Sequence, residues 1–255
     1  MRDPRLETLA TNLLDHSIGL QQGDRLLVEA DVPARDLIVA VLEGAYERGA
    51  VPFFEVGDPR VRRAWLLGAN REQMDLEVGW SLRRLDDIEA SIYIIAGDNA
   101  SEMADVPPAI LEASRLAGQP LMDKYLTKKW CLLRYPTPSA AQAAGMSTEG
   151  FEDFCLDVSS LDYARMDEAM DPLVELMSRT DRVRIVSPGT DLSFSIKGIP
   201  VLKAAGKNNI PDGEVFTGPV ETQVDPYARR PGVSRGVVER LLRDAVEGRL
   251  HLRRE

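Results

Sequence analysis

The stretch KNNIPDGEVFTGPVET at 207–222 places one carboxylate, Glu214, directly after a run of Asn, Pro, Asp and Gly. These residue types are common where a chain reverses direction, and the following VFT is typical of a strand. A carboxylate fixed by such a turn is a suitable ligand for a divalent metal ion, and Asp212 and Glu221 are close by in sequence. The residue pattern alone nevertheless favours a hairpin turn with an exposed glutamate.

Other residues that could do chemistry are few. The chain has two histidines, His16 and His251, and neither forms part of a Ser-His or Cys-His pattern, which disfavours a hydrolase built on such a pair. Cys131 and Cys155 are each flanked by apolar or aromatic residues, so we expect inert buried thiols. Asp191 follows Gly-Thr at the start of a strand-like run, where a local turn hydrogen bond is the simplest role.

The composition is that of a globular protein. The 255 residues are 44% apolar and 28% charged, and the formal net charge is −10. This acidic balance argues against a nucleic-acid-binding surface. The sequence has no apolar run long enough to span a membrane, and its N-terminus lacks the apolar core of a signal peptide. We therefore expect a cytoplasmic protein that binds neither nucleic acid nor membrane.

The elements that must position Glu214 begin with alternating strands and helices. Apolar runs bounded by turn residues predict strands, and runs with helical spacing separate them. The strands are expected at 24–30, 51–57, 90–97 and 129–136. Such alternation predicts a Rossmann-like α/β domain with a mostly parallel sheet and flanking helices over residues 1–180.

Nucleotide binding by this sheet is a weaker alternative. The first predicted strand is followed by EADVPARD, which contains no Gly-x-Gly-x-x-Gly, and no P-loop occurs in the chain.

The pattern changes near residue 181. Two consecutive helical patterns cover 137–180, with STEG as an expected helix start, and RVRIVSPGTDLSFSIKG then alternates apolar and polar residues around Pro-Gly. The change predicts a domain boundary and a hairpin.

Three separated blocks of this sequence resemble the thermophilic metalloaminopeptidase family, the aminopeptidases S, T and II of bacteria. They are KKWCLLRYPTPSAAQAAGMSTEGFEDFCLDVSSLDYARM, PGTDLSFSIKG and NNIPDGEVFTGPVET. The resemblance covers about residues 1–224, and Asn-x-Pro-Asp-Gly-Glu-Val-Phe is its most specific part.

The resemblance implies an enzyme that removes N-terminal residues from peptides with two divalent metal ions, zinc or cobalt, and that is usually a homodimer. It implies an N-terminal α/β domain followed by a strand-rich α+β catalytic domain, which would begin at 181–224. Glu214 corresponds to a metal ligand of the family, whereas the remaining ligands, a second Glu, two His and an Asp, lie further downstream in the family. No catalytic residue can be assigned here.

After Val224 the sequence departs from this resemblance. Residues 225–255 contain eight Arg, no Lys and five acidic residues, a local charge of +3 against −13 for the preceding part. Helical spacing follows at Val237, Leu241, Leu242, Val246 and Leu250. We therefore expect a C-terminally truncated member with a divergent Arg-rich tail and impaired peptidase activity. The alternative is a non-catalytic α/β module for dimerisation or ligand binding.

Overall fold

The computed structural model describes residues 3–220. The described residues divide into two compact units, the first formed by residues 3–168 and 204–214, the second by residues 169–203 and 215–220. The expected helix within 225–255 and His251 lie outside the described residues.

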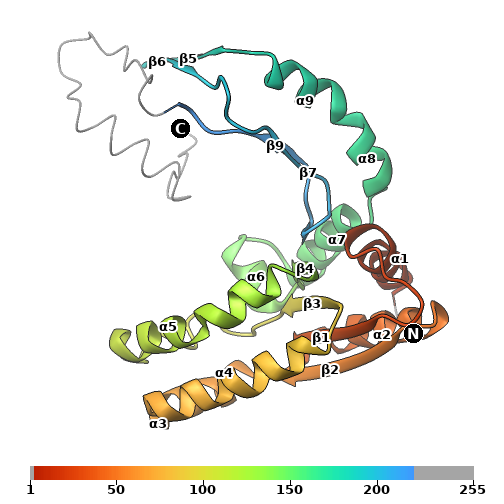
Figure 1. The fold of residues 1–255 in the computed structure, drawn as a ribbon, viewed down its shortest axis with the longest axis vertical. Coiled ribbons are helices and arrows are strands. Elements are labelled where there is room, and N and C mark those ends of the chain that lie inside the picture. Colours follow the sequence, from red (N-terminus) through yellow and green to blue (C-terminus); the bar gives the residue numbers. More distant parts are fainter. Residues whose placement is uncertain (1–2, 221–255) are drawn as a thin grey trace. The chain divides into compact units, whose positions relative to one another are not determined.

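A five-stranded parallel sheet forms the centre of the first unit, in the order β2-β1-β3-β4-β8. Strands β1, β2, β3 and β4 are labelled in Figure 1. Its strands are β1 (Arg25–Asp31), β2 (Val51–Gly57), β3 (Ala90–Ile95), β4 (Lys129–Arg134) and β8 (Asn209–Ile210). The expected α/β class and the four expected strands are therefore confirmed.

The helices of the first unit connect these strands. They are α1 (Arg5–Thr11), the π-helix η1 (Asn12–Ser17), the 3₁₀ turn η2 (Val32–Ala34), α2 (Arg35–Glu47), α3 (Pro59–Gly68), α4 (Arg71–Asp86), α5 (Pro108–Tyr125), α6 (Pro138–Ala143), α7 (Thr148–Ser159) and α8 (Tyr163–Ala169). The expected helix start at STEG is confirmed, because the Ser147 side chain accepts a hydrogen bond from the Gly150 N–H.

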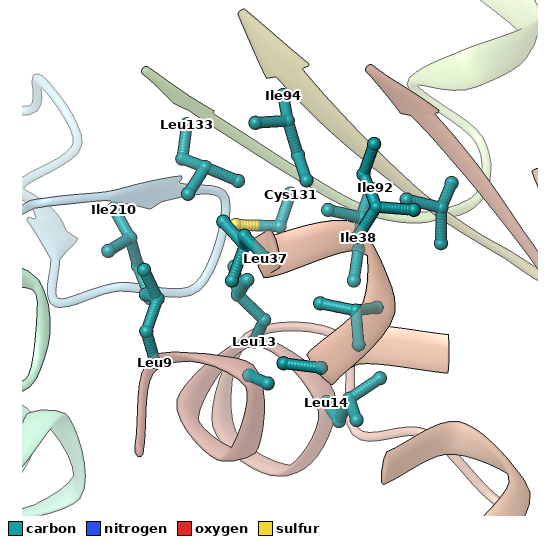
Figure 2. Close-up of a cluster of buried hydrophobic side chains, with 14 of the residues drawn as sticks. Leu9, Leu13, Leu14, Leu37, Ile38, Ile92, Ile94, Cys131, Leu133 and Ile210 are labelled. Atoms are coloured by element: carbon teal, nitrogen blue, oxygen red, sulfur yellow. The ribbon is translucent and has the colours of Figure 1, made fainter. Parts of the chain in front are cut away.

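The alternation of side chains along β1 assigns the helices to the two faces of the sheet. Leu26 and Val28 pack with α1, η1 and α2 in the largest core cluster, part of which Figure 2 shows. Leu27 points the other way, into a smaller cluster with Leu85 of α4. Successive residues of a strand face opposite sides of the sheet, and helices cover both sides here. Odd- and even-numbered positions of β1 must therefore both be apolar, as Leu26, Leu27 and Val28 are.

The second unit is built from one helix and short strands. Its described elements are α9 (Asp171–Ser178), β5 (Arg182–Ser187) and β6 (Thr190–Ser195). Strands β5 and β6 pair antiparallel, as the alternating pattern predicts. Asp191 accepts hydrogen bonds from the Arg184 guanidinium across this hairpin, at 2.8 Å.

Strands β7 (Leu202–Ala204) and β9 (Glu214–Phe216) form a two-stranded ladder. The chain between them contributes β8 to the large sheet. The chain passes from the second unit to the first within β7, after Lys203, and returns to the second unit within β9, after Glu214.

The two cysteines differ in burial. Cys131 is buried, as expected, whereas Cys155 is only partly buried, and both are free thiols.

None of the helices in residues 3–220 has the length and apolar composition that a membrane-spanning helix needs.

Candidate functional site

Residues 205–214, called the β8 segment below, lead directly to Glu214. The segment is not the tight turn that its composition favours. Instead, Asn209 and Ile210 pair in parallel with Leu132 and Leu133 of β4, at the edge of the large sheet. The Leu132 N–H donates to the Asn208 carbonyl at 2.8 Å.

An apolar anchor holds the middle of the β8 segment. The Ile210 side chain is 2% exposed and belongs to the core cluster that contains Leu9 and Leu133 (Figure 2). Burying a side chain of this size contributes roughly 1.5–3 kcal/mol. The strand therefore has a strong reason to remain docked although it is only two residues long.

The start of the β8 segment is bound by η1. The imidazole Nε2 of His16 lies 2.7 Å from the carbonyl oxygen of Ala205, and the Ser17 hydroxyl donates to the Gly206 carbonyl at 2.5 Å. The Lys207 ammonium donates back to the His16 carbonyl at 3.1 Å. His16 thus acts as a hydrogen-bond partner of the backbone.

Tyr163 also helps to hold the β8 segment in place. Its ring stacks on His16, with centroids 6.1 Å apart, and its hydroxyl donates to the Val158 carbonyl at 2.9 Å. The same hydroxyl lies 3.3 Å from the Asp212 N–H, which donates to it. Burial raises the pKa of the Tyr163 phenol, which keeps the proton needed for the bond to Val158.

Asp212 fixes the backbone immediately before Glu214. Its carboxylate accepts hydrogen bonds from the Gly206 N–H at 3.0 Å and from the Gly213 N–H at 3.1 Å. Gly213 has a φ of 149°, a conformation that residues with a Cβ rarely adopt. Because both oxygens of Asp212 are used in this way, Asp212 has a structural role in the segment.

Glu214 differs from Asp212 in its surroundings. It is exposed at the start of β9, and within residues 3–220 its carboxylate has no hydrogen-bond or ion-pair partner. A carboxylate without a partner, carried on a fixed backbone, is available to an external cation. Glu221, the other nearby carboxylate of the sequence, lies outside the described residues.

The described residues do not fit a complete metal centre. In residues 3–220, no three His, Cys, Asp or Glu side chains converge so that they could hold a metal ion. Zinc needs three or four protein ligands, and Glu214 supplies one.

Sequence reasoning found Glu214 but missed the residues that hold its segment, Ser17, Tyr163 and the π-helical His16. Tyr163 occurs in the longest block that resembles the metalloaminopeptidases, and this is the one signal that could have identified it.

The sequence pattern of the thermophilic metalloprotease (M29) family matches residues 2–238. The chain belongs to this family. The match includes the whole large sheet, the β8 segment and Glu214, and it continues past Val224.

A solved structure supports the same fold. Wild-type AmpT from Thermus thermophilus superposes with a TM-score of 0.69 at 21% sequence identity, over 85% of this chain. This chain covers 62% of the length of that structure, so it spans less than two thirds of that relative. An alcohol dehydrogenase superfamily protein from Novosphingobium aromaticivorans gives a TM-score of 0.26 at 14% identity, over 68% of this chain and 50% of its own length. None of the curated proteins matches the sequence.

Proposed function

We propose that this M29-family chain is a metal-dependent aminopeptidase in which Glu214 is one ligand of a divalent metal pair, zinc or cobalt. The substrate is the N-terminal residue of a peptide. The observation that carries the proposal is the carboxylate of Glu214, which has no partner within residues 3–220, on a segment that hydrogen bonds at Gly206 and Asp212 hold in place.

The chemistry of a metal pair suits this role. If bound, divalent ions would supply a water of lowered pKa and would polarise a carbonyl group. The contribution of the β8 segment is to hold the Glu214 backbone in place, because a ligand that moves by about 1 Å weakens a catalytic site strongly. The segment achieves this through Ile210 in the core and Asp212 on the backbone.

Three regions of the chain have different roles in this proposal. Residues 1–180 serve as the N-terminal α/β domain, 181–224 as the beginning of the catalytic domain, and 225–255 as a divergent Arg-rich tail, of which the family pattern still matches the part up to residue 238. A homodimer in the cytoplasm is the state that the family resemblance implies.

Activity of the 255 residues by themselves is impaired in this proposal. One ligand from residues 3–220 cannot hold two ions tightly, and the described part contains no other group of donors. The chain therefore hydrolyses peptides slowly unless further ligands are supplied.

Leucine-p-nitroanilide hydrolysis with added zinc or cobalt tests the function. We expect slow, chelator-sensitive hydrolysis that Glu214→Gln abolishes and that the matched surface variant Glu149→Gln leaves unchanged. Hydrolysis insensitive to both chelator and Glu214→Gln would contradict the metal role. Rapid hydrolysis with the expected sensitivities would contradict only the impairment.

A non-catalytic α/β module is the second candidate. It is favoured by the absence of a three-donor cluster in residues 3–220 and by the complete core of the first unit. In that case the wild-type chain would bind zinc and cobalt no better than the Glu214→Gln variant does.

A further inference from the structure

The hairpin of β5 and β6 has one apolar face. In an antiparallel pair, side chains of directly opposite residues lie on the same face of the sheet. The register pairs Val183 with Phe194 and Ile185 with Leu192, so these four apolar side chains share a face, called the hairpin face below.

The opposite face of the same hairpin is mainly polar. Arg184 and Asp191 form their ion pair there, and Val186 is the apolar residue beside them. The two strands therefore have the hydrophobic-in, polar-out alternation of a sheet that is covered on one side.

Within residues 3–220 the hairpin face lacks a cover. Ile185 is 48% exposed, and the other three side chains of the face are only partly buried. None of the hydrophobic clusters in this part of the chain includes a residue of β5 or β6. A hairpin of two strands is marginally stable in water unless a helix or further strands pack on its apolar face. The face therefore needs a covering element in addition to these residues.

Residues 237–250, which lie outside the described residues, have the sequence pattern of such an element. Apolar pairs recur every four residues, and the full set is Val237, Val238, Leu241, Leu242, Ala245, Val246 and Leu250. At about 100° per residue, these positions fall along one side of a helix. The pattern predicts an amphipathic helix with a continuous apolar side.

The polar side of this pattern carries charges of both signs. Glu239 and Arg243 are four residues apart, as are Arg240 and Asp244, a spacing at which opposite charges stabilise a helix. Residues 237–250 contain three Arg and three acidic residues. This balance disfavours a lipid surface as the partner of the apolar side, because helices that lie on membranes are rich in Lys and Arg on their polar face.

We propose that residues 237–250 form a helix that lies on the hairpin face and covers it within the same chain. The last described residue, Val220, is at this hairpin, since its N–H donates to the Ser195 carbonyl at 2.7 Å. The 16 residues 221–236 span at most about 55 Å. A helix over 237–250 is about 21 Å long, close to the roughly 20 Å of the six-residue strands β5 and β6.

The connection favours a contact within one chain over a contact between two copies. Residues 221–236 contain Pro226, Pro231, Gly232 and Gly236, which are residue types that let a chain reverse direction. A short tether of this kind keeps the attached segment at an effective concentration of roughly millimolar. The segment therefore competes well against a second copy at lower protein concentrations.

Thiol labelling of the full 255-residue chain tests the contact without reference to metal binding or peptidase activity. In a Cys155→Ser background the remaining native cysteine, Cys131, is buried. A thiol introduced by Ile185→Cys should then react at least about tenfold more slowly than one introduced by Val186→Cys, on the opposite face. Equal rates at the two positions would overturn the proposal, because the hairpin face would then be open.

Two matched changes in the segment identify what covers the face. Leu242→Gln alters the apolar side and Arg243→Gln the polar side, and Leu, Arg and Gln have similar helix propensities. Leu242→Gln should raise the labelling of Ile185→Cys to the rate seen with Val186→Cys, whereas Arg243→Gln should leave it unchanged. Protection that survives Leu242→Gln would overturn the proposal. Protection that increases with protein concentration would also overturn it, because a second copy would then cover the face.

Amide hydrogen exchange gives a measurement that needs no introduced cysteine. In the wild-type chain, residues 237–250 and strands β5 and β6 should both be protected. Leu242→Gln should accelerate exchange in both segments and leave β1 unchanged, because the change releases a local contact. Rapid exchange throughout 237–250 in the wild-type chain would contradict the docked helix.

Discussion

Gly206 lies directly against the ring of Tyr163: a Cβ atom at Gly206 would be 2.6 Å from Cδ1 of Tyr163. Gly206 also has a φ of 78°, a left-handed conformation that glycine adopts at little cost. A change at Gly206 would disturb the segment before Glu214. The Gly206 carbonyl accepts a hydrogen bond from Ser17, and the Gly206 N–H donates one to Asp212.

We therefore expect Gly206→Ala to destabilise the chain by about 2–4 kcal/mol, through left-handed strain of about 1 kcal/mol together with overpacking against Tyr163. Gly145→Ala is the matched control. Gly145 has a φ of 67° but no atom within 4 Å of a Cβ, so it isolates the backbone term. Urea denaturation measures the free energy of unfolding of both variants. Equal decreases in the two variants would show that the contact with Tyr163 adds no cost.

The hydrogen bonds from η1 give a second prediction. His16→Ala and Ser17→Ala each remove a bond to the β8 segment, which is worth about 1 kcal/mol. Amide hydrogen exchange should become faster in residues 205–214 and remain unchanged in the sheet strand β1. Equal acceleration in β1 would indicate global unfolding rather than local release of the segment.

Glu29 gives a prediction on pH dependence. It accepts a short hydrogen bond from the Tyr125 hydroxyl, and Arg84 Nη2 lies 3.4 Å from it. Burial nevertheless raises the pKa of Glu29 above its ordinary value of 4.5, so the folded chain favours the protonated form. The associated stability is present below the unfolded pKa and is lost as the pH rises through the folded pKa.

Glu29→Gln keeps an acceptor for Tyr125 but cannot ionise. We expect its free energy of unfolding, relative to wild type, to increase as the pH rises from about 4.5 through the folded-state pKa of Glu29, and then to level off. A difference between Glu29→Gln and wild type that is constant with pH would contradict the burial effect.

Local sequence patterns predicted the large sheet well because its core strands carry runs of apolar residues. Val28 and Ile92 lie in strands bounded by turn residues, and the helices between them have clear 3.6-residue spacing. The helix between β3 and β4 begins at Pro108, since the residues before it form turns and proline suits the first position of a helix.

The site could not be read in the same way. Strand β8 is two residues long, which is too short for any periodicity, and it pairs with β4 through residues that are far apart in the sequence, Leu132 with Asn209. The π-helix that turns His16 toward Ala205 looks like an ordinary helix end in sequence. Glu214 was found through family resemblance to a motif, whereas its supports are set by tertiary contacts that no local pattern encodes.

Binding of zinc and cobalt to the purified chain, measured by equilibrium dialysis beside Glu214→Gln and Glu149→Gln, tests the metal role most directly. We expect fewer than two tightly held ions per chain, with the affinity falling at least about tenfold in Glu214→Gln, a change of about 1.4 kcal/mol, and unchanged in Glu149→Gln. Equal affinity in wild type and Glu214→Gln would contradict the assignment of Glu214 as a metal ligand.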